Sequence, residues 1–338
     1  MRLEVRGGDP FGLFGGTALK SAAKTHPGSC DEDPISSPAS IAALHRLSAP
    51  DNPLDLKMNQ TPASTSRGRL WLKFAENSGT TRMVERDHHG PLVVQKPLYP
   101  EGHGVCQAIV MHPPGGVVAG DELEIRVQAS PSAHGQITSP GATKWYKSTG
   151  RTARQDVHLH VEAGGVLEWM PQETIFFNNA KVMLDHQIVL EKDSVYIGCE
   201  ILCFGRTAFG ESFDSGEVRQ RTSIRREGKL AWFEQLRLAG GSRAMNGRLA
   251  LAGRTVCATF IMSGKPLPAQ AIDLVREEAV RIGGESGQVG ISQFKSLLVA
   301  RFLGDSSEVA RHVMLCVWRA VRPVTLGRPA LVPRSWNT

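Results

Sequence analysis

The sequence predicts an all-β fold, a large β scaffold of many short strands with two helices near the C-terminus. Between residues 70 and 262, short segments rich in Val, Ile, Leu, Thr and aromatic residues are separated by Gly or Pro, at the roughly 8–12-residue spacing typical of all-β proteins. The 35 Gly and 20 Pro residues are many for a helical protein and indicate numerous turns. Strands do not alternate with helices, so a parallel doubly wound sheet is not expected.

Residue alternation identifies most of the strands. In Asp156–Val161, for example, Val157 and Leu159 face one way while His158 and His160 face the other. The expected strands, in chain order, are Leu70–Phe74, Leu92–Gln95, Val105–Met111, Leu123–Ala129, His134–Ser139, Asp156–Val161, Val166–Met170, Lys181–Leu190, Ser194–Phe204, Val218–Arg225 and Leu230–Leu238. The last two flank Arg226-Glu-Gly, which predicts a hairpin turn.

Two segments near the C-terminus have helical spacing instead. Pro268–Ile282 carries apolar residues three or four positions apart and ends at a Gly pair. Ser306–Val321 has a Val stripe and is expected to stop before Pro323, with Asp305 or Ser306 as its N-cap. The two helices flank a strand at Lys295–Phe302, and we expect all three to pack on the β body rather than to form a separate domain.

The first part of the chain differs in composition. Residues 1–57 contain six Pro, many Ser, Ala and Gly, and little periodicity, which predicts a disordered N-terminal extension. Met58 is a candidate for the true start of the protein. Residues 58–338 are expected to form a single domain.

Composition narrows the function classes. The net charge is +6 with the basic residues scattered, so nucleic acid is not the expected partner. The apolar runs are too short for a membrane-spanning helix, and no secretory signal is recognisable. The six Cys are widely spaced, which favours reduced thiols in a cytoplasmic protein. Cys199 and Cys203 fall in an expected strand, where they would lie about 13 Å apart, too far for one metal ion.

Four segments stand out once the usual catalytic signatures prove missing. HPPGGVVAGDEL at 112–123 is a rigid turn that holds Asp121 and Glu122; Asp121 either points inward to a cation or caps backbone amides. SPGATKWYKS at 139–148 is either an interaction surface or a strand edge. LEWMPQETIFF at 167–177 places Glu173 between apolar segments, and CEILCFGRTAFGE at 199–211 holds Glu200 and Glu211. Such acids more often pair with Arg than bind metal.

These four segments, in this order, resemble the urease accessory protein family UreD, called UreH in some organisms. The C-terminal stretch at 297–336 is also similar to the family's C-terminus, and the resemblance runs from about Gly68 to Trp336. It implies a mostly β maturation factor rather than an enzyme. It also implies binding to apo-urease and to UreF, which recruits the GTPase UreG carrying nickel, and an internal tunnel as the route for the metal.

The resemblance further implies a path for transient Ni²⁺ with no permanently bound cofactor. Oxygen ligands would bind this ion weakly enough to release it. By motif, the family's acidic tunnel positions correspond to Asp121 and Glu211, with Glu122, Glu168, Glu173 and Glu200 as further candidates.

Two alternatives remain open at this point. The first is a metal-dependent enzyme on the same β scaffold, with Asp121, Glu211 and a His as ligands. The second concerns the C-terminal helix, whose Val stripe is expected to seal the β body. Its opposite face, with Arg311 and Arg319, is expected to be exposed and would suit an acidic UreF surface.

Overall fold

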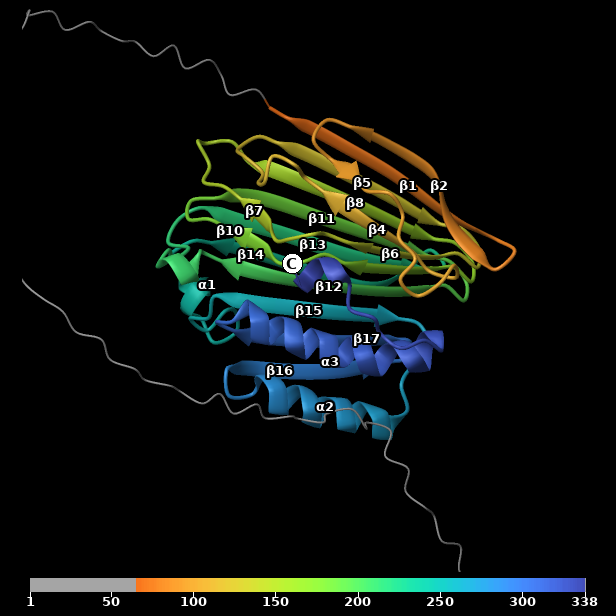
Figure 1. Ribbon diagram of the computed structural model, residues 1–338. Coiled ribbons are helices and arrows are strands. Elements are labelled where there is room, and N and C mark those ends of the chain that lie inside the picture. Colours follow the sequence, from red (N-terminus) through yellow and green to blue (C-terminus); the bar gives the residue numbers. More distant parts are fainter. Residues whose placement is uncertain (1–64, 338) are drawn as a thin grey trace, which may run out of the picture. The chain divides into compact units, whose positions relative to one another are not determined.

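The computed structural model describes residues 65–337 and contains two large β-sheets (Figure 1). The prediction of a disordered extension over 1–57 and of a start at Met58 lies outside the described residues. The first sheet has seven strands, in the order β14 (Lys229–Ala239), β13 (Glu217–Arg226), β11 (Lys181–Leu190), β8 (Ala153–Val161), β5 (Glu122–Ala129), β1 (Arg67–Asn77) and β2 (Thr80–His89). The second has ten strands. Eight follow the order β16 (Gly287–Phe294), β17 (Leu297–Gly304), β15 (Val256–Ser263), β12 (Val195–Phe204), β9 (Val166–Met170), β6 (His134–Thr138), β4 (Cys106–Met111) and β3 (Val93–Val94), and β10 (Thr174–Phe176) pairs with β12 and with β7 (Thr143–Trp145).

The chain passes back and forth between the two sheets. From β4 to β13 the long strands alternate between them, so that β5, β8, β11 and β13 lie side by side in one sheet and β4, β6, β9 and β12 in the other. Neighbours within each of these runs are parallel. A parallel pair needs a crossover, usually a helix; here a strand of the opposite sheet supplies it. The all-β prediction is therefore confirmed, in a solenoid-like form.

The main hydrophobic core lies between the two sheets. Strand alternation assigns one face of each strand to it. On β8, Val157, Leu159 and Val161 are buried in this core, as predicted, and the intervening His158 and His160 lie on the other face. The predicted hairpin is also present, since Glu227 and Gly228 both have positive φ and link β13 to β14, as a two-residue type I′ turn requires.

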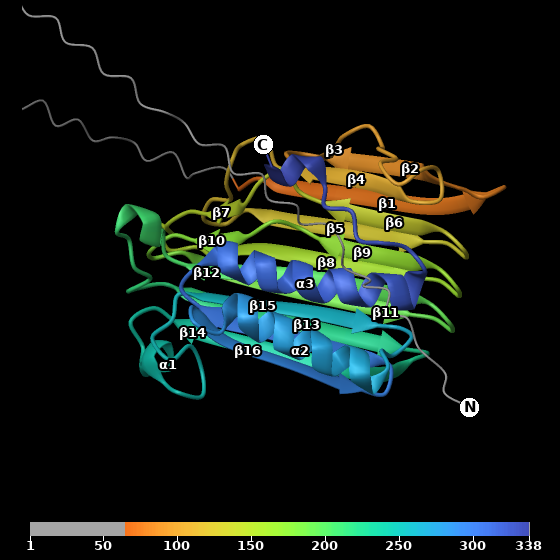
Figure 2. The same ribbon diagram turned by 60° about the horizontal axis from the view of Figure 1, so that its bottom comes forward.

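The two predicted helices cover the outer face of the ten-stranded sheet. α2 (Ala269–Gly283) and α3 (Ser307–Leu326) lie side by side over its β12, β15, β17 and β16 end (Figure 2). Their apolar stripes form a second core with the outward side chains of these strands; Ile272 and Val275 of α2 and Val313 and Val317 of α3 belong to it. The expected packing on the β body is thus confirmed. Within residues 65–337 no helix is long and apolar enough to cross a membrane.

The end of α3 differs from the prediction. Ser306 caps the helix as expected, accepting a hydrogen bond from the Val309 amide at 3.2 Å. The helix does not stop before Pro323 but continues to Leu326. Proline removes one helical hydrogen bond, yet the last turn is retained because the Arg322 side chain is anchored by buried ion pairs and Leu326 packs on the second core.

Sequence reasoning did not identify several elements individually. They are the strands β2, β7, β10, β15 and β16, the brief helix α1 (Arg243–Asn246) and the 3₁₀ turns η1 (Thr207–Phe209) and η2 (Arg334–Asn337). β16 contains Gly287 and Gly290 and is largely exposed, so it lacks the apolar alternation that identifies a strand.

Candidate functional site

A group of polar side chains interrupts the apolar space between the two sheets. On β11 the inward residues are Val182, Leu184, His186, Ile188 and Leu190, and only His186 among them is polar. On β12, Tyr196 and Leu202 belong to the inter-sheet core, while Cys199 and Cys203 face the helices. Because side chains alternate along a strand, Glu200 lies on the same face as Tyr196 and Leu202 and points between the sheets. Gln220 and Thr222 of β13 line the same space.

His186 and Glu200 form an ion pair across this space. The Glu200 carboxylate contacts Nδ1 of His186 and accepts a hydrogen bond from the Gln220 amide. His186 is only 6% exposed, and its other ring nitrogen, Nε2, finds no hydrogen-bond partner among the described residues. Burial alone would lower the pKa of His186, but the Glu200 carboxylate outweighs it and the pKa is raised above its ordinary value of 6.5.

Two cavities meet at this pair. The larger, of about 270 Å³, lies between β13 and β14 on one side and β12, β15 and β17 on the other, and is lined by His186, Glu200, Gln220 and Thr222 among others. The smaller, of about 70 Å³, is also lined by His186 and Glu200 and reaches His112 at the start of the HPPGG turn. The pair therefore forms part of the wall of both cavities.

Polar groups also line the far ends of the two cavities. In the larger one, Arg301 of β17 forms an ion pair with Glu234 of β14 at 2.6 Å. In the smaller one, neither ring nitrogen of His112 has a hydrogen-bond partner in the described part of the chain. Burial lowers the pKa of His112, despite the opposing effect of Asp121, so this imidazole is neutral near pH 7.

Two of the predicted acidic residues lie at the HPPGG turn. Asp121 is buried, and its two carboxylate oxygens accept hydrogen bonds from the Ser66 and Val118 amides, each at 3.0 Å. Asp121 therefore caps backbone amides, which is the second of the two interpretations of this residue. Glu122 is exposed and pairs with Arg67 at 3.0 Å.

Glu211 and Glu173 are each held by an arginine, as acids in such segments commonly are. Glu211 accepts two hydrogen bonds from Arg206, at 2.6 and 3.2 Å, which lower its pKa. Glu173 is buried and pairs with Arg311 of α3, whose Nε lies 2.9 Å away. The expectation that Arg311 projects from an exposed face is therefore wrong, since its side chain turns down to a buried carboxylate.

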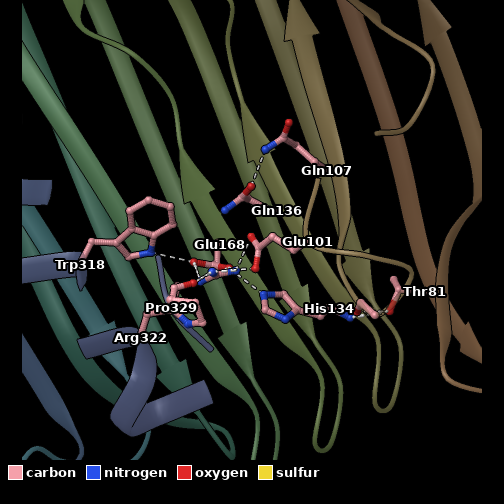
Figure 3. Close-up of polar contacts among 10 residues, drawn as sticks. Thr81, Glu101, Gln107, His134, Gln136, Glu168, Trp318, Arg322 and Pro329 are labelled. Carbon is pink, nitrogen blue, oxygen red and sulfur yellow. Dashed lines mark hydrogen bonds and ion pairs between the residues drawn. The ribbon is translucent and has the colours of Figure 1, made fainter. Parts of the chain in front are cut away.

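Glu168 lies on the opposite face of the ten-stranded sheet from the cavities, beneath α3. Figure 3 shows the Arg322 guanidinium between the Glu101 and Glu168 carboxylates. Glu168 also accepts from Trp318 Nε1 at 2.8 Å and contacts His134 Nε2 at 2.7 Å. Burial alone would raise the pKa of Glu168, but His134 and Arg322 outweigh it and the pKa is lowered.

Sequence reasoning missed His186, His134 and Arg322, although the sequence held a signal for two of them. His186 occupies the inward position of an alternating strand, between Leu184 and Ile188. Arg322 follows Trp318 by four residues, which places both on the same helix face. A polar residue at a core position of a regular element is the signal to look for.

Of the six predicted acidic residues, Glu200 lines both of the cavities described above. Among residues 65–337 no group of three or more His, Cys, Asp and Glu side chains could hold a metal ion. The five described cysteines are free thiols, and burial raises the pKa of Cys199 and Cys203. Where the two cavities meet, the arrangement offers a cation the His186 imidazole, the Glu200 carboxylate and neutral oxygen groups. His112 lies in the wall of the smaller cavity, and Glu234 in that of the larger is paired with Arg301.

Comparison with known proteins gives a consistent result. The family model described as UreD urease accessory protein matches residues 66–337. A urease accessory protein UreD from Nitrosospira multiformis is 85% identical over 275 residues, covering 81% of this chain and 99% of that protein. Proteins of the same name from Janthinobacterium sp. (strain Marseille) and Nitrosococcus oceani are 53% and 44% identical, covering 80% and 86% of this chain and 92% and 95% of their own lengths.

Proposed function

Because this chain belongs to the UreD family of urease accessory proteins, we propose that it is a scaffold that, with UreF and UreG, delivers nickel to apo-urease through the space between its two sheets. The observation that carries this proposal is the polar lining of two adjoining cavities inside an otherwise apolar core. A buried polar group without a partner is costly. In these cavities Nε2 of His186 and both ring nitrogens of His112 lack a partner among the described residues, which is unfavourable for folding alone and is explained by a polar or charged occupant.

The chemistry of the lining suits transit better than storage. Nickel binds imidazole well and oxygen donors more weakly. The cavity walls supply single donors spaced along the path, such as His186, Glu200 and Thr222, rather than a closed cage. An ion that meets one or two protein ligands at a time and keeps some water can bind and leave. Of the predicted acidic residues, Glu200 lines both cavities, and we propose it as the principal carboxylate of the route. The others do not line them; these are Asp121, Glu122, Glu168, Glu173 and Glu211.

The alternative of a metal-dependent enzyme receives less support. Its expected ligands were Asp121, Glu211 and a His, but Asp121 accepts two backbone amides and Glu211 is bound by Arg206. Neither carboxylate is available without breaking those contacts. A non-catalytic accessory role agrees with the names of the relatives and is the function we propose.

The proposal is tested by filling the larger cavity. Thr222 of β13 is buried and lines that cavity, which has room for a larger side chain. Thr222→Phe should leave binding to UreF and apo-urease unchanged but lower the nickel content and activity of co-expressed urease at least several-fold. The measurement is metal analysis of urease purified after co-expression, together with co-purification of the accessory proteins.

The matched control is Ser223→Phe. Ser223 is the next residue on β13 and faces the other side of the sheet, so that this variant adds the same ring without entering the cavity. It should load nickel like the wild type. Normal nickel loading by a folded Thr222→Phe protein would show that the ion takes another route, and failure of the wild-type chain to co-purify with urease and UreF would overturn the scaffold function itself.

A further inference from the structure

We infer that Nε2 of His186 is a ligand for the divalent metal ion in the inter-sheet space, and that Glu200 is the positioning residue that aims it. This inference rests on the proposed function, because it names the group that would hold the ion along the route. It also replaces the emphasis on carboxylates with a nitrogen ligand that sequence reasoning did not select.

The first argument is the tautomer of the ring. Glu200 contacts Nδ1 of His186, and a carboxylate accepts a hydrogen bond, so the proton of the neutral ring lies on Nδ1. The lone pair is then on Nε2. A carboxylate that holds one nitrogen while the other binds metal is the usual arrangement around metal-ligating histidines, where it fixes the ring and raises its basicity. The Gln220 amide donates to the same carboxylate and fixes it in turn.

The second argument is the environment of Nε2. This atom is buried and has no hydrogen-bond partner within residues 65–337, although the residue lines two cavities. An orphaned buried nitrogen is unfavourable for folding. Binding an ion at Nε2 would satisfy it. The Trp169 and His186 rings are arranged edge to face, with centroids 6.4 Å apart, which limits the orientations that the imidazole can adopt.

The third argument is that the site is incomplete as a metal cage. Around His186 and Glu200 the cavity walls contribute the Thr222 hydroxyl, the Gln220 amide and the Tyr196 phenol. Waters would complete the coordination of a six-coordinate ion. Such a site exchanges its ion readily, as a carrier of nickel requires.

The inference is tested with NiCl₂ and the full-length protein. Ni²⁺ affinity is measured by calorimetric titration, and the ligand type by X-ray absorption, in which imidazole gives a characteristic outer-shell scattering pattern. The expected result for His186→Asn is loss of the imidazole-bound ion. Glu200→Gln should keep the imidazole ligand, because the Gln oxygen still accepts from Nδ1, but should weaken binding by about 10–100-fold.

His158→Asn is the matched control. His158 belongs to the neighbouring strand β8 and faces away from the inter-sheet core, so its removal should reduce only non-specific surface binding. Thermal unfolding of each variant checks that the fold is intact. Equal Ni²⁺ affinity and an equal imidazole signal in the wild type and a folded His186→Asn protein would overturn the inference. If Thr222→Phe still prevented nickel loading in that case, the proposed route would stand without His186 as its ligand.

Discussion

At the scale of single residues, the charged groups inside this protein depend on partners far away in the sequence. Glu168 and Arg322 are both completely buried and are 154 positions apart. An isolated buried charge is strongly unfavourable, whereas a pair with further hydrogen bonds is tolerated. Glu101, His134 and Trp318 supply those further contacts. The sequence indicates which acids lie in apolar segments, but the choice of partner depends on the tertiary fold, and it was therefore not predictable.

The contribution of this pair is measured with Glu168→Gln. Glutamine has nearly the same volume and its side-chain oxygen can still accept from Trp318, but it leaves the buried Arg322 with Glu101 as its one carboxylate partner. We expect the free energy of unfolding at about pH 7 to fall by about 3 kcal/mol, the cost of breaking a buried ion pair. Urea unfolding followed by fluorescence measures it. A loss below about 0.5 kcal/mol would show that the pair adds nothing net to stability.

The pH dependence of the same variant has a defined sign. The pKa of Glu168 is lower in the folded protein than its ordinary value of 4.5. Its stabilising contribution is thus fully present above that value and is lost as the pH falls through the folded-state pKa. Because glutamine does not titrate, the difference in unfolding free energy between wild type and Glu168→Gln should shrink as the pH is lowered below about 4.5. A constant difference would assign the effect to packing instead.

At the scale of elements, alternation and helical spacing identify a strand or helix and its buried face. They identified Val166–Met170 and Lys181–Leu190 with the bounds that the structure has. They do not identify the neighbour of a strand. β11 pairs with β8 and β13, while the strands that adjoin it in the chain, β10 and β12, lie in the other sheet. For that reason the parallel pairing without connecting helices was not predicted. The residues that form the inter-sheet polar group were not predicted either, because the pairing of the strands decides which side chains meet there.

The packing of α2 on α3 depends on one glycine. A methyl group at Gly283 would lie 2.7 Å from Val313 Cγ2 and 2.9 Å from Val289 Cγ2, both closer than van der Waals contact. Gly283→Ala should lower the free energy of unfolding by about 1–3 kcal/mol through overpacking. This loss opposes the stabilisation that alanine would otherwise bring to a helix. Gly290→Ala on β16 is the control, because a methyl group there meets no atom within 4 Å. Thermal or urea unfolding compares the two, and equal stabilities would mean that the helices separate at no cost.

At the scale of the whole molecule, the two ends of the seven-stranded sheet differ in character. β2, at one end, carries Arg82, Glu85, Arg86 and Asp87 on its exposed positions, and charged residues protect a sheet edge against pairing with another chain. β14, at the other end, also carries charged residues, but it exposes two large apolar side chains, Leu230 at 54% and Phe233 at 53%, where β2 exposes Val84. An exposed apolar edge strand is a site of self-association unless a partner covers it.

This difference predicts how the protein behaves without its partners. Expressed alone, the chain should self-associate through β14 and dissolve poorly, and co-expression with UreF should improve its solubility if UreF covers this edge. Phe233→Lys should raise the soluble, monodisperse fraction of the chain expressed alone, because a charge at the edge opposes strand pairing.

Val84→Lys is the matched control, because Val84 is a similarly exposed apolar residue on β2, at the opposite end of the sheet. It should change the soluble fraction little. Sedimentation velocity measures the distribution of species. A wild-type chain that is a monomer at all concentrations would exclude association through β14, and an equal gain from both substitutions would assign the effect to net charge rather than to this strand.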